Sequence, residues 1–274
     1  MSDNPEISKS IDAGGITTNY HDEGSGSPVV LLHGSGPGVS AWANWRPVLP
    51  ALAEHFRVVA PDIVGFGFTE RPDGIQYTMD NWTKHAVDFL DAMEIEQADI
   101  VGNSFGGALA ETLAIRHHDR VRRLVLMGSG GVQFELTEGL DIAWGYTPSI
   151  ENMKQLLDLF AYSRELVTDE LAELRYKASM RPGIQEAYSQ MFPAPRQNGI
   201  NELAPSDDEL RALEHQTLIV HGREDRIIPP AASRKLFELL PNAQLHMFAK
   251  CGHWTQIEHT ARFNQLVINF FSES

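Results

Sequence analysis

The chain has 274 residues, of which 42% are hydrophobic and 22% are charged, a composition typical of a globular protein. Its 22 basic and 37 acidic residues give a formal net charge of −15, which argues against nucleic acid or an anionic membrane as the main partner. The one cysteine, Cys251, excludes a disulfide framework and a cysteine-rich metal site.

The N-terminal segment and the hydropathy pattern predict where the protein works. Residues 1–10 are polar and acidic, without the apolar stretch of a signal peptide. No apolar run approaches the roughly 20 residues that span a bilayer. We therefore expect a cytoplasmic protein that does not contact a membrane.

Short strand-forming runs recur along the chain. A hairpin is predicted first, around Gly14-Gly15. A wholly apolar run follows at 29–32 and similar runs recur after it, a pattern typical of strands buried on both faces of a parallel sheet. They lie at 29–32, 56–60, 100–101, 124–127, 217–220 and 245–248.

Helical periodicity separates several of these runs. Apolar residues recur at helical spacing over 81–93, 107–116, 231–240 and 262–271. Strands and helices in alternation predict an α/β fold with a mostly parallel central sheet.

One long stretch breaks the alternation. Residues 133–212 contain no convincing strand, but have helical segments at 150–161 and 168–180 and a proline-rich connection at 192–195. We interpret this stretch as a helical lid inserted between two parts of the core, residues 1–132 and 213–274. The alternative is that the insertion only adds packing.

The sharpest motif is G-N-S-F-G at 102–106, which matches G-x-S-x-G. It follows an apolar strand and precedes an Ala-rich helix, the context that a nucleophile elbow requires. The glycines allow a tight turn, and the helix N-terminus directs N–H groups at developing negative charge. Ser104 is therefore the predicted nucleophile, and an ordinary tight turn is the alternative.

A serine nucleophile needs a base and an orienting carboxylate, and in this arrangement they follow the serine in the order acid, then histidine. The strand ending at His221 leads to two carboxylates, of which Asp225 is favoured over Glu224. The last strand leads to His253 in a glycine-containing loop. His221, His246 and His259 are competitors, and we interpret each as a structural histidine.

The loop H-G-S-G-P-G at 33–38 follows the first apolar strand. It fails the spacing of a dinucleotide-binding loop, because Val39 stands where the third glycine would be and Pro37 interrupts it; no P-loop motif occurs elsewhere. We interpret it as the loop that gives one N–H to an oxyanion hole, at Ser35, while Phe105 gives the second.

Arg175 lies on the apolar face of the predicted helix at 168–180. Glu173 and Lys177 can pair with each other on the opposite side, whereas Arg175 has no acidic neighbour three or four residues away. A charge on an apolar face needs an anion. Periodicity alone leaves open whether that anion is a distant carboxylate of the protein or a carboxylate of the substrate.

Together these motifs resemble the α/β-hydrolase family, and within it the meta-cleavage-product hydrolases of bacterial aromatic degradation. The resemblance spans nearly the whole chain and is greatest to the branch acting on 2-hydroxymuconate semialdehyde and 6-alkyl analogues. It rests on the stretches at 33–38, 41–45, 65–67, 102–107, 137–140, 144–146 and 251–254.

The resemblance implies an activity and further site residues. Such enzymes hydrolyse a C–C bond of 2-hydroxy-6-oxohexa-2,4-dienoates to 2-hydroxypenta-2,4-dienoate and a carboxylic acid, with no metal or organic cofactor. Arg175 would bind the dienoate carboxylate, and a homodimer is expected. Asn44, Asn103 and Trp254 would line the dienoate half of the pocket, while the 6-substituent would contact Gly130, Leu140, Trp144, Ile200 and Ile228.

Rival functions make different demands on the same residues. A carboxylesterase would use the same triad but has no need of Arg175. Dehalogenases and epoxide hydrolases require an aspartate where Ser104 stands. A binding protein on a hydrolase scaffold would not need an intact Ser104, Asp225 and His253.

Overall fold

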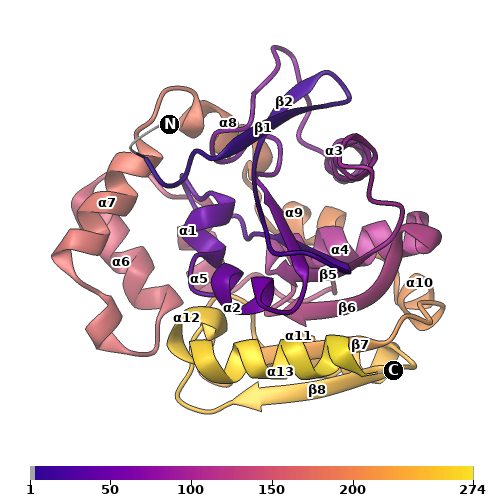
Figure 1. Ribbon diagram of the computed structural model, residues 1–274. Helices are drawn as coiled ribbons and strands as arrows, with labels where there is room; N and C mark the ends of the chain where they lie inside the picture. The colour runs from indigo at the N-terminus through magenta and orange to yellow at the C-terminus, as the bar shows by residue number, and fades with distance from the viewer. Residues whose placement is uncertain (1–3, 274) are drawn as a thin grey trace.

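The computed structural model describes residues 4–273 and places one eight-stranded sheet at the centre of the molecule (Figure 1). The strand order is β1-β2-β4-β3-β5-β6-β7-β8. β1 and β2 form the predicted hairpin, with β1 antiparallel to β2 and β2 antiparallel to β4, and the remaining pairs are parallel. The strands are β1 Lys9–Ala13, β2 Ile16–Glu23, β3 Pro28–Leu32, β4 Arg57–Pro61, β5 Ala98–Asn103, β6 Val121–Met127, β7 Thr217–Gly222 and β8 Ala243–Phe248.

The central strands are largely apolar because helices cover both faces of the sheet. Val29 and Leu31 pack into one hydrophobic cluster with Trp45 and Phe263, while Val30 and Leu32 pack into the other. This alternation follows from the two-residue period of a strand. The predicted α/β fold with a mostly parallel sheet is therefore confirmed.

Two sets of helices sandwich the sheet. One face is covered by α1 Ala41–Trp45, α2 Leu49–Ala53 and α13 Thr260–Ser272, which lies in the foreground of Figure 1. The other face is covered by α3 Met79–Ala92, α4 Phe105–Arg116 and α11 Pro230–Leu239. The short elements η1 His118–Arg120 and α12 Thr255–Glu258 complete the core.

The four helices predicted in the core are present, and their N-termini lie one or two residues earlier than the periodicity indicated. α3 begins after Thr78, whose side chain accepts a hydrogen bond from the Asn81 N–H (3.3 Å). α13 begins after His259, as expected for that competitor of His253.

Between β6 and β7, residues 128–216 form helices and connecting loops and no strand. This helical insert contains the two predicted helices, now α6 Ile150–Phe160 and α7 Asp169–Ser179, each capped by the hydroxyl of the preceding residue. It also contains short helices that periodicity did not indicate, because three to eight residues span too few turns to make a pattern. They are α5 Glu138–Trp144, η2 Arg164–Leu166, α8 Ile184–Met191, α9 Gln197–Leu203 and α10 Asp207–Arg211.

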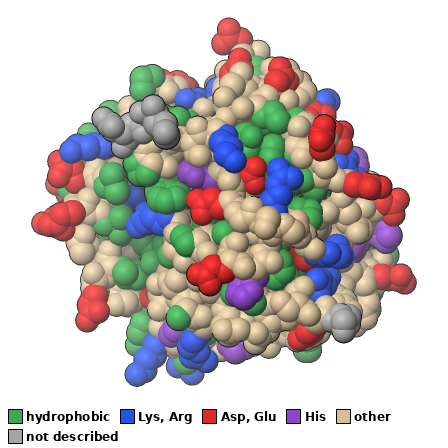
Figure 2. Space-filling view, in the orientation of Figure 1, with side chains coloured by type: hydrophobic (Ala, Val, Ile, Leu, Met, Phe, Trp, Pro, Cys, Tyr) green, Lys and Arg blue, Asp and Glu red, His purple; other side chains and the backbone are tan. Residues whose placement is uncertain are grey.

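On the face shown in Figure 2, Asp and Glu side chains are interspersed with Lys and Arg side chains. None of the helices within residues 4–273 is long and apolar enough to cross a bilayer.

The junction of β3, β5 and α4 depends on glycine. A Cβ on Gly102 would lie 2.4 Å from the Gly106 carbonyl oxygen, and one on Gly106 would lie 2.3 Å from the Leu32 carbonyl oxygen. Backbone atoms cannot give way as a side chain can, so both positions require glycine at the observed strand–helix separation.

We expect Gly106→Ala to destabilise the protein by roughly 1–3 kcal/mol, because the new methyl group forces α4 away from β3. Urea denaturation measures this change. Gly130→Ala is the control, since its methyl group would meet only the Ile228 Cδ1 atom, at 3.8 Å. Equal midpoints for the two variants would contradict the packing argument.

Candidate active site

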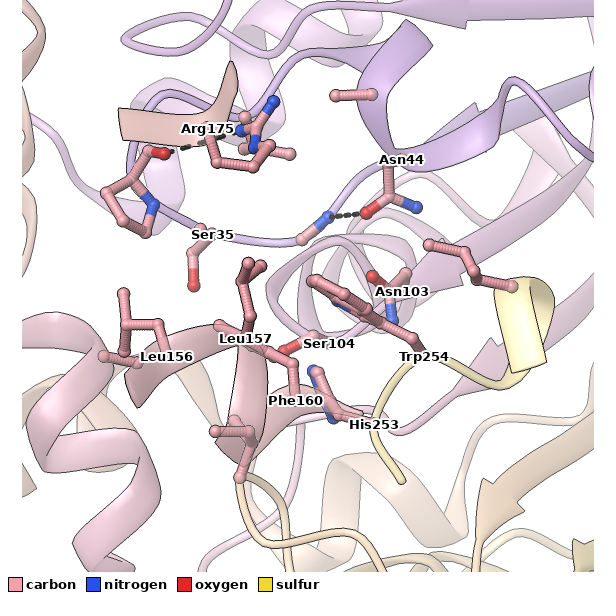
Figure 3. Close-up of a pocket in the computed structure, with 18 of the residues that line it drawn as sticks. Ser35, Asn44, Asn103, Ser104, Leu156, Leu157, Phe160, Arg175, His253 and Trp254 are labelled. Atoms are coloured by element: carbon pink, nitrogen blue, oxygen red, sulfur yellow. Dashed lines mark hydrogen bonds between the residues drawn. The ribbon is translucent and has the colours of Figure 1, made fainter. Parts of the chain in front are cut away.

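A pocket opens where the carboxyl ends of the parallel strands meet the helical insert (Figure 3). In the view of Figure 3, Arg175 and Asn44 lie at one end of the pocket, and Ser104 and His253 lie at the other. The loop after β3 lines it, as do residues of α6 and α7 from the insert. Ligands in open α/β sheets bind at this edge.

Ser104 sits at the turn between β5 and α4 in a strained conformation. Its φ is 55° and its ψ is −115°, a region that residues with a side chain seldom adopt. The Ser104 N–H donates to the Met127 carbonyl (2.9 Å), and its carbonyl accepts from Gly107 (2.9 Å). The turn is therefore held from both sides, and its hydroxyl faces the pocket.

Asp225 and His253 form a buried pair beside this serine. The Asp225 Oδ2 atom lies 2.7 Å from His253 Nδ1, and the two residues are 8% and 3% exposed. Burial alone would raise the pKa of Asp225, but the charge and hydrogen bonds of His253 and His221 hold that pKa well below its usual range. The N–H groups of Ile227 (2.8 Å) and Ile228 (3.1 Å) donate to the other carboxylate oxygen.

The competing carboxylate and histidines have other partners. Glu224 accepts from the Cys251 N–H (3.0 Å) and pairs with Arg223. His221 lies in β7, with its Nε2 atom 3.0 Å from the Ile228 carbonyl and 3.2 Å from Asp225. His259 stacks against Phe248, and the His246 ring lies tilted against the same phenyl ring.

The insert also fixes the backbone of His253. The His253 N–H donates to the carbonyl of Phe160, the last residue of α6 (2.7 Å). The Phe160 ring stacks on Trp254, with centroids 5.3 Å apart and an interplanar angle of 3°. Core and insert therefore meet directly at the candidate base.

The loop after β3 is held by a neutral histidine. The His33 Nε2 atom accepts from the Ile63 N–H (3.0 Å), so its Nδ1–H donates to the Gly34 carbonyl (2.8 Å). Burial lowers the pKa of His33 to about 4, consistent with the neutral ring.

This loop and the start of α4 present backbone N–H groups beside Ser104. The Gly34 N–H donates to the Asn44 Oδ1 atom (3.3 Å). The next residue is Ser35, whose Oγ atom accepts a hydrogen bond from the Trp144 indole N–H (3.1 Å). Phe105 is the first residue of α4, a position whose N–H has no acceptor within the helix.

Arg175 reaches the pocket from α7 without an acidic partner. Its one hydrogen bond joins Nη2 to the Pro37 carbonyl at 3.5 Å, and no described carboxylate lies within ion-pair distance. Burial lowers the pKa of Arg175, but a guanidinium remains charged at neutral pH. The predicted Glu173–Lys177 pair is confirmed at 3.0 Å. The charge of Glu6 acts on Arg175 from beyond ion-pair distance, so the pocket contains a cation without a contacting carboxylate among the described residues.

Other predicted residues line the same pocket. The Asn103 side chain donates to the Met127 carbonyl (3.3 Å), and Trp254 closes one wall. The Asn44 Nδ2 atom is buried and has no hydrogen-bond partner among the described residues. Such a donor favours a ligand with an oxygen at that point.

A second, smaller cavity adjoins Ser104. The structure brings to it all five residues assigned to the 6-substituent, together with apolar side chains that the sequence did not single out. Its lining is Ser104, Phe105, Gly130, Phe134, Leu140, Trp144, Ile200, Leu203 and Ile228.

Sequence reasoning missed several residues of the main pocket, among them Arg46, Phe160 and Gln256. Arg46 adds a second positive charge near Arg175. Its signal was a basic residue next to the A-W-A-N-W motif, in a short helix that periodicity did not indicate. Phe160 and Gln256 gave no signal, because ordinary apolar and polar residues at those positions suit many helices.

Cys251 packs into the hydrophobic cluster that contains Phe248 and Phe263. It is fully buried, and burial raises the pKa of its thiol to about 12. The reactive thiolate is therefore scarce at neutral pH.

Comparisons with known proteins agree with this geometry. Residues 27–260 match the family model described as "alpha/beta hydrolase fold". The chain is 60% identical to the 2-hydroxymuconate semialdehyde hydrolase of Pseudomonas sp. strain CF600, covering 98% of this chain and 95% of that protein. It is 59% identical to the 2-hydroxy-6-oxo-2,4-heptadienoate hydrolase of Pseudomonas putida strain F1, covering 98% of both.

A solved structure is equally similar. The meta-cleavage product hydrolase CumD of Pseudomonas fluorescens IP01 superimposes with a TM-score of 0.97, at 60% identity over 98% of each chain.

We expect Asp225→Asn to lower kcat on an activated ester, p-nitrophenyl acetate, by roughly 10⁴-fold, because His253 loses the group that fixes its tautomer. Glu224→Gln is the matched control and should change kcat less than severalfold. Stopped-flow release of p-nitrophenolate measures both. Equal losses in the two variants would contradict the assignment of the acid.

Proposed function

Because this chain belongs to the α/β-hydrolase family and is related throughout its length to meta-cleavage product hydrolases, we propose that it hydrolyses a C–C bond of 2-hydroxy-6-oxohexa-2,4-dienoates. The products are 2-hydroxypenta-2,4-dienoate and a carboxylic acid. Such a step belongs to the degradation of aromatic compounds by meta-cleavage.

One observation carries the proposal: a positive charge that forms no ion pair with a described carboxylate lies in the same pocket as a serine and a buried Asp–His pair. Arg175 supplies the charge, and Ser104 and His253 line the other end. A dienoate substrate has its carboxylate at one end and its C6 carbonyl at the other. The pocket therefore matches both ends of this substrate.

The dienoate end is held by charge and hydrogen bonds. Arg175 binds the carboxylate, as guanidinium groups commonly do. The free Asn44 amide N–H group supports a contact to a substrate oxygen, and Asn103 and Trp254 line the same half. Ketonisation of the dienol then moves a proton to C5 and forms a C2 carbonyl conjugated with the C3=C4 double bond. The electron pair left on C5 when the C5–C6 bond breaks is therefore delocalised onto the C2 carbonyl oxygen.

Ser104, Asp225 and His253 act as the triad. His253 takes the Ser104 proton while Oγ attacks the C6 carbonyl, and Asp225 holds the imidazole in the required tautomer. The backbone N–H groups of Ser35 and Phe105 receive the oxyanion. Each such donor contributes about 3–4 kcal/mol to transition-state stabilisation in comparable sites.

Collapse of the tetrahedral intermediate breaks the C5–C6 bond. The electron pair moves to C5 and into the conjugated keto acid, and a proton completes the dienoate product. Ser104 retains the C6 fragment as an acyl ester. Water activated by His253 then releases the carboxylic acid and restores the serine.

The small cavity beside Ser104 accommodates the 6-substituent. Its walls carry bulky side chains, among them Trp144, Phe134 and Leu140, so hydrogen or a small alkyl group fits the assignment. The names of the two relatives compared above specify an unsubstituted and a methyl-substituted dienoate, which supports the same range.

The organisation of the chain follows from this function. Residues 133–212 act as a lid over the core formed by residues 1–132 and 213–274, since side chains from α6 and α7 line the pocket.

The enzyme works in the cytoplasm, as its composition suggests, and as a homodimer, as the family resemblance implies. A carboxylesterase is not favoured, because an ester needs no counterpart to Arg175.

The dienoates are yellow, and cleavage removes their visible absorbance. We expect wild-type protein to bleach 6-unsubstituted or 6-methyl dienoate faster than the 6-phenyl compound. Ser104→Ala should bind the substrate yet lose at least roughly 10³-fold in kcat, because no nucleophile remains. Product chromatography should show one carboxylic acid per dienoate consumed.

A Ser104→Ala variant that bleached the dienoate at the wild-type rate would contradict the mechanism. Turnover of esters without any loss of dienoate colour would contradict the substrate.

A further inference from the structure

A carboxyl group outside the pocket is buried behind the nucleophile. Glu111 lies in α4, two turns beyond Ser104, and is fully buried. Its Oε1 atom accepts a hydrogen bond from the Ser129 hydroxyl (2.6 Å), and its Oε2 atom has no hydrogen-bond partner among residues 4–273. No step of the proposed reaction uses it.

The surroundings of Glu111 favour the neutral form of its carboxyl group. Burial raises the pKa of Glu111 to about 8, and the Ser129 hydroxyl offsets this only in part. No described basic side chain forms an ion pair with it, and an ionised carboxylate here would lack compensation. A buried polar group of this kind destabilises the fold unless its hydrogen bond is made. The presence of Glu111 at this position therefore indicates a specific role.

The partner of Glu111 belongs to the short loop Gly128 to Gly131, which we call the β6 loop. Three hydrogen bonds fasten this loop. The Gly128 N–H donates to the Val220 carbonyl (2.9 Å), the Gly130 N–H donates to the Ser104 carbonyl (3.2 Å), and the Gly131 N–H donates to the Ser129 Oγ atom (3.1 Å). The Ser129–Glu111 hydrogen bond joins the same loop to the middle of α4.

The Glu111 and Ser129 side chains fill the space next to two glycines, Gly131 and Gly107. A Cβ on Gly131 would lie 1.8 Å from the Glu111 Oε2 atom, and one on Gly107 would lie 2.5 Å from the Ser129 Oγ atom. Both positions therefore admit only glycine while Glu111 and Ser129 occupy this space.

The β6 loop lies beside the Asp225–His253 pair and lines the small cavity. A Cβ on Gly128 would meet the His253 ring at 3.3 Å and the Asp225 carboxylate at 3.5 Å. Gly130 lines the small cavity, opposite Ile228. A shift of this loop would change the cavity wall and the packing of the Asp–His pair together.

We propose that Glu111 is a positioning residue that, through Ser129, holds the β6 loop and so sets the size of acyl group the enzyme accepts. The inference rests on the proposed function, since it assigns the small cavity to the C6 fragment. Glu111 touches no substrate. It acts through Gly130, the part of the β6 loop that lines the small cavity.

The test compares the selectivity of variants rather than their activity alone. Glu111→Met keeps the length of the side chain but cannot accept the hydrogen bond, and Ser129→Ala removes the other partner. Glu111→Gln keeps an acceptor for Ser129. Thr112→Val is the control in the same helix, because Thr112 lines a separate surface cleft.

The readout is the ratio of kcat/KM for a 6-propyl dienoate to that for the 6-methyl dienoate. We expect Glu111→Met and Ser129→Ala each to raise this ratio by roughly tenfold, because a loosened wall discriminates less between small alkyl groups. Glu111→Gln and Thr112→Val should keep the wild-type ratio.

An unchanged ratio in Ser129→Ala and in folded Glu111→Met, with only a lower melting temperature, would overturn the proposal. Ser129→Ala removes one hydroxyl and decides the matter if Glu111→Met does not fold.

The same variants separate this inference from the proposed function. If wild-type protein leaves every dienoate intact, p-nitrophenyl acetate and butyrate replace the pair, since their acyl groups form the same ester with Ser104. A ratio that changes with the esters supports the role of Glu111 even then, and an unchanged ratio rejects it.

Discussion

The close approach of α4 to the ends of β3 and β5 is the constraint on which the rest of the site depends. Glycine at 102 and 106 allows backbone to lie where any Cβ would collide with a carbonyl group. Ser104 then turns the chain at a positive φ, and the loop after β3 lies within reach of the first turn of the helix. One packing requirement thus brings the candidate nucleophile and both candidate oxyanion donors together.

Electrostatics add selectivity to this geometry. A chain with a formal charge of −15 repels anions at long range, so an anionic substrate needs a local cation. Arg175 supplies one, with Arg46 beside it, and neither has an ion-pair partner among the described residues. At the other end, the Asp225 carboxylate accepts a hydrogen bond from His253 beside Ser104. The two ends therefore suit a substrate with a carboxylate at one end and an electrophilic carbonyl at the other.

Residue patterns predicted the sheet, the long helices and the assignment of Ser104, Asp225 and His253, because each depends on local sequence and on the order of elements. Short helices such as α9 escaped prediction, since tertiary contacts rather than periodicity define them. Glu111 gave no signal either. In an Ala-rich helix it resembles an exposed residue, and only the packing of Gly131 and Ser129 against it reveals a buried acid. For Arg175, periodicity could not decide between a carboxylate of the protein and a carboxylate of the substrate as its partner. Only the three-dimensional structure shows that no described carboxylate contacts it.

The central claim is that Arg175 recognises the carboxylate of a dienoate while the serine performs the chemistry. The most direct measurement compares kcat/KM of wild type and Arg175→Gln on 6-methyl dienoate and on p-nitrophenyl acetate. We predict a loss of roughly 10²-fold or more for the dienoate, because a charge-assisted contact is removed, and little change for the ester. Equal losses on the two substrates, or an unchanged rate on the dienoate, would contradict the account.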